Sequence, residues 1–466
     1  MGLARENRIV GKPPCHMASA TQVKVRFHLA SHLPSHNHIT TIHRAPTTMS
    51  PILPRELIDL CIAASRDCLP TLLQFSLVSK QCASEARKYA FKEINLDRRD
   101  RAVGAYSCYI QKLLNLLESN RMLENYVRAL VLPLEPSIYA ASEAYTEDIL
   151  TILKHFTSLT TLSIIPRDVC DWETLPDSLK QSIGLSCSAP SIISLNFSNF
   201  LNFPGHLVQS ALNLKFLTLT NLITARDGRS QSGPPAGCGL RPRSEPRLEK
   251  LQHLTCYITN QEDFNFCCRI MRECAGSLRV LRIAFLTSKV IHNSPIHLGD
   301  MIDLRPVVTL RLSSFVEVKD HGDGTIALGR HLPLYLDILQ FQRNAKEFII
   351  DIRVYNSRGH DTDSELPPAI LPNCEAWKAM DEYLSSEKTT SPKRTFLNFY
   401  TIGWGSRPTT DDRYRVVGPE QMSAFENRLL SEAREVLHRA IDANRLSIAI
   451  SEGRIPALAT SPRQES

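Results

Sequence analysis

The sequence predicts an α/β protein in which a short module of three helices precedes an irregular α/β solenoid. Three observations indicate this. Residues 50–96 hold short apolar segments with helical spacing, a leucine-rich pattern recurs seven times between residues 127 and 312, and helix-like segments precede several of its copies. A long amphipathic segment near the end of the chain would close the open end of such a solenoid.

The bulk composition is that of an ordinary globular protein. The 466 residues are 43% hydrophobic and 22% charged, and the length allows about two to four domains. The thirteen cysteines are odd in number and scattered, which is typical of a reducing compartment. We therefore expect a cytoplasmic or nuclear protein. No apolar run approaches the roughly 18 residues of a transmembrane helix, so we expect no membrane partner.

Residues 1–48 differ from the rest of the chain. They hold six cations (Arg5, Arg8, Lys12, Lys24, Arg26 and Arg44) against one acid, Glu6, and so account for five of the six net positive charges. The near-neutral remainder predicts no nucleic-acid partner. We expect a disordered basic arm, or an extension ahead of a natural start at Met49, with a mitochondrial targeting segment as the alternative. Four nearby histidines (His32, His36, His38 and His43) lack a scaffold that would fix a metal ion.

The apolar segments of residues 50–96 predict three short helices. Pro54 suits the first turn of one helix, and Leu53, Leu57, Leu60, Cys61 and Ala64 then recur on one face of it. A second helix follows Pro70, and a third is expected from about residue 84 to 91, before a short strand at 94–96. A domain this small exposes much of its surface, so some apolar side chains must face another protein or the rest of this chain.

The order of residues in this module resembles an F-box, and most closely the F-box-like domains of basidiomycete fungi. The family's opening Leu-Pro-x-Glu-Leu-Ile corresponds to residues 53–58, its Thr-Leu-Leu to 71–73 and its Leu-Val-Ser-Lys to 77–80. Its closing Arg, aromatic pair and strand correspond to Arg87, Tyr89, Phe91 and residues 94–96. The sequence departs from the family at Cys82, where a Trp is usual.

The resemblance implies a partner and a role. An F-box docks onto a Skp-type adaptor, which links it to the cullin of an SCF-type ubiquitin ligase, while a leucine-rich region binds the target protein. The resemblance assigns adaptor docking to seven residues: Leu53, Pro54, Leu57, Ile58, Leu72, Leu77 and Val78. The alternative is a leucine-rich interaction scaffold without ligase function, in which the three helices only cap the solenoid.

The long second part, residues 104–416, carries the repeated pattern apolar-x-x-apolar-x-apolar. Its seven copies begin at Val127, Leu159, Ile192, Leu214, Leu251, Leu278 and Val307, at intervals of 22 to 37 residues. In a leucine-rich repeat the last two apolar residues of each copy point inward from a short strand, and the residue between them faces the concave surface. An ordinary α/β domain with leucine pairs in its strands is the alternative.

Three further segments complete the organisation. Residues 224–247 are rich in Gly, Pro and Arg, which predicts a disordered insertion between two repeats. Residues 346–356 read as a buried strand, and 419–446 as one amphipathic helix that caps the solenoid. Residues 452–466 are expected to be disordered.

No motif in the sequence predicts catalysis or a cofactor. There is no phosphate-binding loop, nucleophile elbow or H-E-x-x-H motif. Cys267, Cys268 and Cys274 lack the second matched pair of a zinc site. The acids Asp361, Asp363 and Glu365 do not match the spacing of a calcium loop. We therefore expect a non-enzymatic interaction protein with no metal and no cofactor.

Overall fold

The computed structural model describes residues 53–97, 105–135, 143–224, 248–274, 276–285, 304–318, 345–356, 375–386, 394–402 and 419–452, with a few single residues between 332 and 371. The chain divides into two compact units, residues 1–95 and residues 96–466. The basic arm at 1–48, the insertion at 225–247 and the tail at 453–466 lie outside the described residues.

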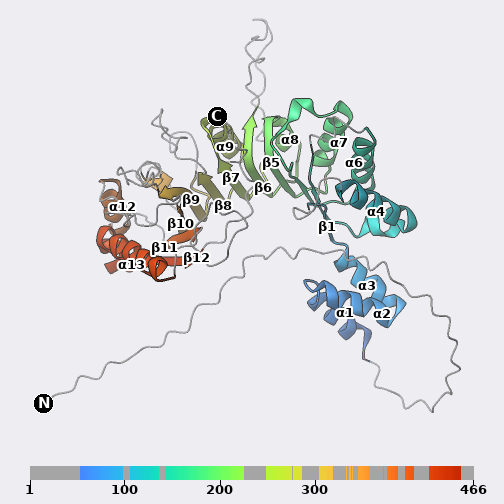
Figure 1. Cartoon of the computed structure of the whole chain (residues 1–466), viewed down its shortest axis with the longest axis horizontal. Coiled ribbons are helices and arrows are strands. Elements are labelled where there is room, and N and C mark those ends of the chain that lie inside the picture. The colour runs from blue at the N-terminus through green and yellow to red at the C-terminus, as the bar shows by residue number, and fades with distance from the viewer. Residues whose placement is uncertain are drawn as a thin grey trace, which may run out of the picture. The chain divides into compact units, whose positions relative to one another are not determined.

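The first unit consists of three short helices and a strand (Figure 1): α1 (Arg55–Ala64), α2 (Leu69–Val78), α3 (Lys80–Ala90) and β1 (Glu93–Asn95). Proline lies in the first turn of α2, where its missing N–H costs no hydrogen bond. Ser79 ends α2 and caps α3, since its Oγ accepts a hydrogen bond from the N–H of Cys82 at 3.1 Å. The third helix therefore begins at Lys80, four residues earlier than the apolar spacing predicted.

All three helices contribute to one small core in this unit. Its buried members are Ile62, Leu72, Cys82, Ala86 and Ala90, and Ile58, Leu69, Phe75, Tyr89 and Phe91 pack against them. The face of α1 that points into this core carries isoleucines, whereas its leucines point outward. The leucines that the spacing placed on one face of α1 therefore line its exposed side, and a second apolar face packs into the core.

The second unit is built on one parallel sheet whose strands follow one another in sequence order. The order is β2, β3, β5, β6, β7, β8, β9, β10, β11 and β12, with β4 beside β5. Their bounds are β2 Ala129–Leu132, β3 Thr161–Ile164, β4 Cys170–Asp171, β5 Ser194–Phe203, β6 Phe216–Thr224, β7 His253–Ile258, β8 Val280–Phe285, β9 Thr309–Val318, β10 Glu347–Asn356, β11 Arg394–Ile402 and β12 Leu446–Glu452. The strands thus form where the seven leucine-rich copies and the strand at 346–356 were predicted.

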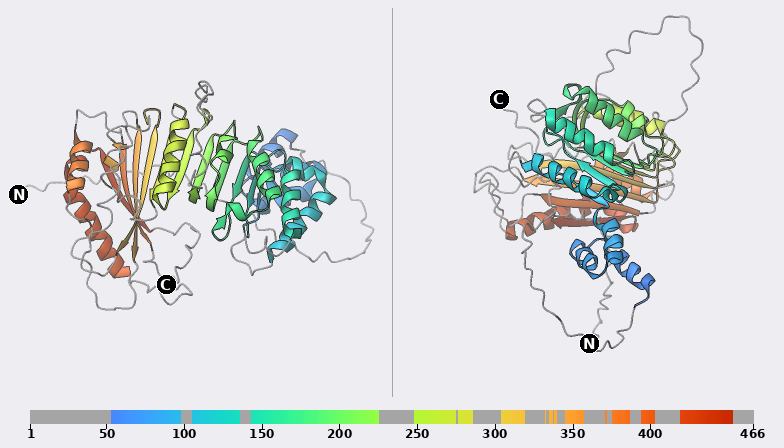
Figure 2. Two further views of the ribbon diagram at one scale, coloured as in Figure 1. Left: turned by 90° about the horizontal axis from the view of Figure 1, so that it is seen from above. Right: turned by 90° about the vertical axis from the view of Figure 1, so that its right-hand side faces the viewer.

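Helices lie in several of the connections between strands and run along one side of the sheet, as Figures 1 and 2 show for α6 to α9. The helices are α4 (Ala105–Ser119), α6 (Glu143–His155), α7 (Asp177–Ser188), α8 (His206–Gln209), α9 (Gln261–Glu273), α12 (Glu375–Ser385), α13 (Pro419–Val436) and α14 (His438–Asp442), with short 3-10 turns η1 (Arg121–Asn125) and η2 (Trp172–Thr174). Parallel strands need such crossover connections, since no tight turn can join them.

A repeated backbone hydrogen bond fixes where each strand begins. The carbonyl of Arg128 accepts from the N–H groups of both Thr160 and Thr161, at 2.8 and 2.9 Å. The same double acceptance recurs at the carbonyls of Thr160, Ile193, Lys215, Gln252, Arg279 and Val308. Each strand therefore starts in the same register with its neighbour, although the connections between the strands differ in length.

Alternate side chains of the strands fill the core beneath the helices. Leu130, Leu162, Leu195, Leu217, Leu254, Leu281, Leu310 and Phe348 form one continuous row across neighbouring strands, and all are buried. The residues between the core positions lie on the opposite face of the sheet, because strand side chains alternate.

The strand β5 departs from this alternation. Asn199 and Asn202 adopt left-handed φ values of 60° and 51°, which Asn tolerates better than most residues. Each shifts the phase of the strand, so that Phe197, Phe200 and Phe203 all point into the core three residues apart, with ring centroids 4.8 to 6.5 Å from one another. The Asn199 amide donates to the carbonyl of Pro166 at 2.9 Å, which holds the bend.

The C-terminal end of the described chain corrects two boundaries. The predicted single helix at 419–446 is two helices, because the chain breaks at Leu437 between α13 and α14. Asn444 then turns the chain with a φ of 54°, and β12 pairs in parallel with β11. The sheet therefore extends beyond the predicted limit at residue 416, and the helical segment lies within the repeating unit rather than after it.

Candidate functional site

The first unit exposes a set of large aliphatic side chains just before α1, on α1 and on α2. These are Leu53, Leu57, Leu60, Leu73, Leu77 and Val78, and we call them the outer apolar set. Leu77 is 86% exposed and Val78 is 71% exposed at the end of α2. Six large exposed aliphatic side chains on so small a unit form a candidate interaction surface.

The predicted docking residues divide between this surface and the core. Leu53, Leu57, Leu77 and Val78 belong to the outer apolar set, and Pro54 beside them is also exposed.

Two of the predicted docking residues are directed elsewhere. Leu72 is only 2% exposed and lies in the core of the first unit, so its assignment to docking is corrected: it stabilises the fold instead. Ile58 is half-buried and packs against the same core. Leu60 and Leu73 are exposed but were not predicted. Leu60 shares the helical spacing of Leu53 and Leu57, and this signal could have identified it.

The face of the sheet opposite the leucine row carries a polar cluster centred on Asp351 in the second unit. This carboxylate is fully buried, and it accepts hydrogen bonds from Asn398 at 3.0 Å and Ser313 at 3.3 Å. Arg311 forms an ion pair with it from the neighbouring strand. Burial by itself would lower the pKa of Arg311, but the bond to Asp351 outweighs this and raises it. The cluster therefore joins β9, β10 and β11 as a neutralised structural group.

A tyrosine lies next to this cluster. Tyr400 has a raised pKa, chiefly because it is half-buried and secondly because Asp351 is near. The guanidinium of Arg353 lies over the Tyr400 ring, 6.0 Å from its centroid. The phenol thus stays protonated near neutral pH, which does not fit a general base.

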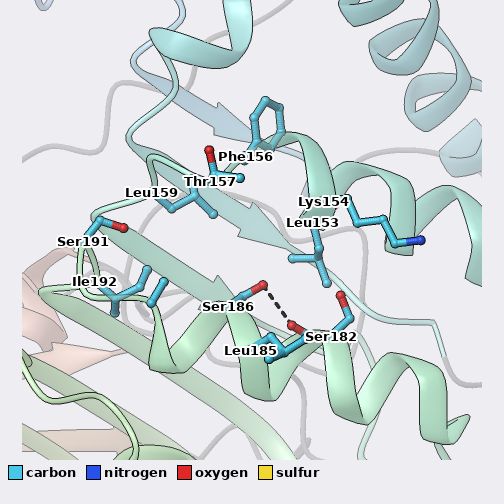
Figure 3. Close-up of a pocket in the computed structure, with 11 residues that line it drawn as sticks. Leu153, Lys154, Phe156, Thr157, Leu159, Ser182, Leu185, Ser186, Ser191 and Ile192 are labelled. Atoms are coloured by element: carbon cyan, nitrogen blue, oxygen red, sulfur yellow. Dashed lines mark hydrogen bonds between the residues drawn. The ribbon is translucent and has the colours of Figure 1, made fainter.

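A small cavity of about 250 Å³ opens between α6 and α7 (Figure 3). Leu153, Phe156, Leu159 and Ile192 supply apolar walls, and hydroxyl groups come from Ser182, Ser186 and Ser191. The Ser186 hydroxyl is already used, since it donates to the Ser182 carbonyl at 2.9 Å. This lining holds no acid–base pair, so the cavity suits an apolar side chain better than a reaction.

Two buried thiols, Cys187 in α7 and Cys274 after α9, and the buried carboxyl of Asp263 in α9 are parts of the packed core. Burial raises the pKa of Cys187 and of Cys274 to about 12, so both thiols stay protonated near neutral pH. The pKa of Asp263 is raised to about 6 by burial, although Thr259 donates two hydrogen bonds to its carboxylate. Asn260 in turn accepts from the N–H of Asp263 at 2.9 Å, which completes a cap on α9.

Within the part of the chain that the structure describes, no three His, Cys, Asp or Glu side chains gather as metal ligands. The histidines at 32–43 and the acids at 361–365 lie outside that part. None of the described helices combines the length and the hydropathy needed to cross a bilayer.

Comparison with known proteins adds no assignment. No family model matches the chain. No curated protein matches it either.

Proposed function

We propose that this chain is the substrate-recognition adaptor of an SCF-type ubiquitin ligase. In this proposal the first unit is an F-box-like module that docks onto a Skp-type subunit, and through it onto a cullin. The second unit is an irregular leucine-rich-repeat solenoid that binds a target protein. The observation that carries the proposal is the outer apolar set on α1 and α2.

The energetics of the first unit support a docking role. Its core is built largely from small residues, with Cys82, Ala86 and Ala90 on α3. Full burial of one Leu or Val side chain contributes about 1.5–3 kcal/mol, and the outer apolar set gains only part of this while it is exposed. Helices that place leucines in water when core positions hold alanine are better explained by a partner than by folding alone.

The departure at Cys82 affects the core rather than the outer surface. Cys82 is 6% exposed and packs among the core residues of α3. A cysteine fills less volume than the usual tryptophan, so the module is held together by a smaller core. Leu57, Leu77 and Val78 remain exposed, so the proposed contact with the adaptor does not depend on this position.

The second unit supports the target-binding half of the proposal. Its strands follow sequence order in parallel, and the double hydrogen bond at each strand start repeats at seven carbonyls. Such a regular sheet leaves one long face for a target. The action is positioning: the adaptor raises the effective concentration of a target lysine near charged ubiquitin, without chemistry of its own.

A pull-down of the full chain with a purified Skp-type subunit tests the proposal. Leu57→Asp together with Val78→Asp should weaken capture about tenfold or more, since two charges would be buried in an apolar contact. The matched control places the same charges at exposed polar positions of α2 and α3, as Gln74→Asp with Ser84→Asp, and should change capture by less than about twofold.

Two outcomes contradict the proposal. If the double variant at Leu57 and Val78 binds like the parent, the outer apolar set is not the docking surface. If the parent chain fails to bind where a well-behaved F-box binds, the ligase role is wrong. The alternative, a leucine-rich interaction scaffold without ligase function, would then be the remaining proposal.

A further inference from the structure

The cavity between α6 and α7 lies where two connections of the second unit turn into the sheet (Figure 3). Its lining continues from the two helices onto Thr157 and Leu159, just before β3, and onto Ser191 and Ile192, just before β5. Four stretches of one compact unit therefore form its walls.

Small side chains on α7 leave this space open. Ser182, Ser186 and Ala189 recur at helical spacing along α7 and its C-cap, and all three line the cavity. From α6, Leu153 and Phe156 line it as well, and these two side chains are only 5% and 3% exposed. Because these walls are already packed, the cavity is preformed and does not need a ligand to open it.

The size of the cavity indicates what it can hold. Its volume is about 250 Å³. An apolar cavity of about 150 Å³ holds one benzene molecule, whereas sites for drug-sized ligands usually measure about 300–1,000 Å³. Leu185, which also lines the cavity, is 67% exposed and so offers apolar surface at its rim. One aromatic side chain presented by another protein therefore fits better than a free cofactor.

One hydroxyl group in the cavity lacks a partner. The Oγ atom of Ser191 is shielded from solvent and forms no hydrogen bond within the part of the chain that the structure describes. Buried polar atoms are normally paired, and an unpaired one costs free energy. An occupant with a hydroxyl group at the end of an apolar body would supply the missing partner. This favours a tyrosine side chain over phenylalanine or leucine.

The lining contains a single charged residue, Lys154, which is exposed. Among the described residues its ammonium group takes part in no ion pair and no hydrogen bond. A carboxylate next to the bound side chain would therefore meet a cation that has no other partner.

The other charged side chains near this end of α6 and on α7 are paired with one another. His155 contacts Glu124 at 2.9 Å, and Lys180 contacts Asp177 at 3.4 Å and Glu173 at 3.8 Å. The acids of α6 lie six or more residues before Lys154, which is about 9 Å or more along the helix; they are Glu143, Glu147 and Asp148. None of them lies one helical turn from Lys154, so the cavity favours an anionic neighbour.

We propose that this cavity binds a tyrosine side chain of the target protein that has an acidic residue beside it. The inference rests on the target-binding half of the proposed function and specifies what the target presents. The ring lies among Leu153, Phe156 and Ile192, and its hydroxyl group meets Ser191. The carboxylate meets Lys154 at the exposed rim, where an ion pair adds little affinity and is screened by salt. Burial of the ring therefore supplies most of the binding.

Saturation-transfer difference NMR of the full chain with the capped tripeptide acetyl-Glu-Tyr-Glu-amide tests the inference. The ring protons of the tyrosine should receive the strongest transfer, because they are the buried part of the ligand. The tripeptide with alanine in place of tyrosine should bind at least about tenfold more weakly. The tripeptide with phenylalanine should bind about threefold more weakly, since it leaves Ser191 unpaired.

Filling the cavity should abolish binding. Ser186→Leu places a large side chain in the cavity, and binding of the tripeptide should weaken at least about tenfold. The matched control is Ser188→Leu on the same helix: Ser188 is exposed and outside the lining, and its hydroxyl group likewise donates to a carbonyl of α7, that of Leu185, at 3.0 Å. This control should stay within about twofold of the parent. Ser182→Leu is a second filling variant, and both should keep the far-ultraviolet circular dichroism of the parent.

Two further variants test the polar contacts one at a time. The parent should prefer the tripeptide to its analogue with glutamine at both flanks by about threefold, and Lys154→Gln should remove that preference. Ser191→Ala should remove the preference for tyrosine over phenylalanine. A residue that only stabilises the fold would weaken all the peptides alike, so these preferences distinguish contact from structure.

Three outcomes would overturn the inference: no binding of the tripeptide by the parent, equal losses in Ser186→Leu and Ser188→Leu, or binding of free p-cresol as tight as that of the tripeptide. The last would make the cavity a site for small phenols. Capture by the Skp-type subunit should persist in every variant, because the outer apolar set is unchanged. Failure of the tripeptide with capture intact therefore refutes only this inference, and tripeptide binding without capture refutes only the ligase role.

Discussion

Substitutions at two leucines of α2 distinguish a residue that stabilises the fold from one that contacts a partner. Leu72 is 2% exposed in the core of the first unit, whereas Leu77 is 86% exposed. Leu72→Ala should cost about 2–5 kcal/mol, because it removes a buried side chain and leaves a cavity. A module of this size rarely holds more than about 3–5 kcal/mol of stability, so the loss is close to its total. Leu77→Ala should cost at most a few tenths of a kcal/mol, since little of that side chain is covered.

Hydrogen exchange of the full chain measures this difference, with peptides that cover α1 to α3. A loss of about 3 kcal/mol accelerates exchange through opening of the module more than about a hundredfold, whereas Leu77→Ala should leave exchange within about twofold of the parent. Capture by a Skp-type subunit should be weakened directly by Leu77→Ala. The reasoning is refuted if Leu77→Ala accelerates exchange as much as Leu72→Ala, because Leu77 would then be a core residue.

Three further predictions concern the second unit. Asp351→Ala should lower the free energy of urea unfolding of the second unit by about 3–5 kcal/mol, because Arg311 loses its buried partner. The double variant Arg311→Met with Asp351→Leu should recover most of that loss. An unchanged urea midpoint for Asp351→Ala would contradict this. The pKa of Asp263 in the fold is raised from 3.8 to about 6, so the native state holds the proton more tightly and stability should fall as pH rises from about 4 to 6. Asp263→Asn should flatten that part of the pH profile of urea midpoints, and an identical slope would show that another group titrates. Gly205→Ala should lower the melting temperature, because its new Cβ would lie 2.8 Å from the Phe266 ring, and a melting temperature equal to the parent's would show that the ring moves aside freely.

The number and type of elements in the first unit followed from its sequence. Apolar spacing located the helices, with Pro54 directly before α1 and Pro70 in the first turn of α2. The direction of each side chain did not follow. Leu72 and Leu77 both belong to one short apolar run, and only the packing of α2 against α3 decides which of them is buried.

The polar groups of the second unit were missed for a related reason. Arg311, Asp351 and Asn398 come from three strands that are far apart in sequence, and only the pairing of β9, β10 and β11 brings them together. No local pattern marks such a group, since each residue by itself reads as an ordinary strand position.

The sequence by itself determined the class and order of this protein: a small helical unit, then strands at each leucine-rich copy, with helices between them. Periodicity is a local property, and it survives the differing lengths of the connections. Only the tertiary structure decided which faces are covered, because burial depends on what lies opposite a side chain. It placed Leu72 in the core and Leu77 in water, and it added β12 to the sheet where the sequence had predicted that a helix caps the end.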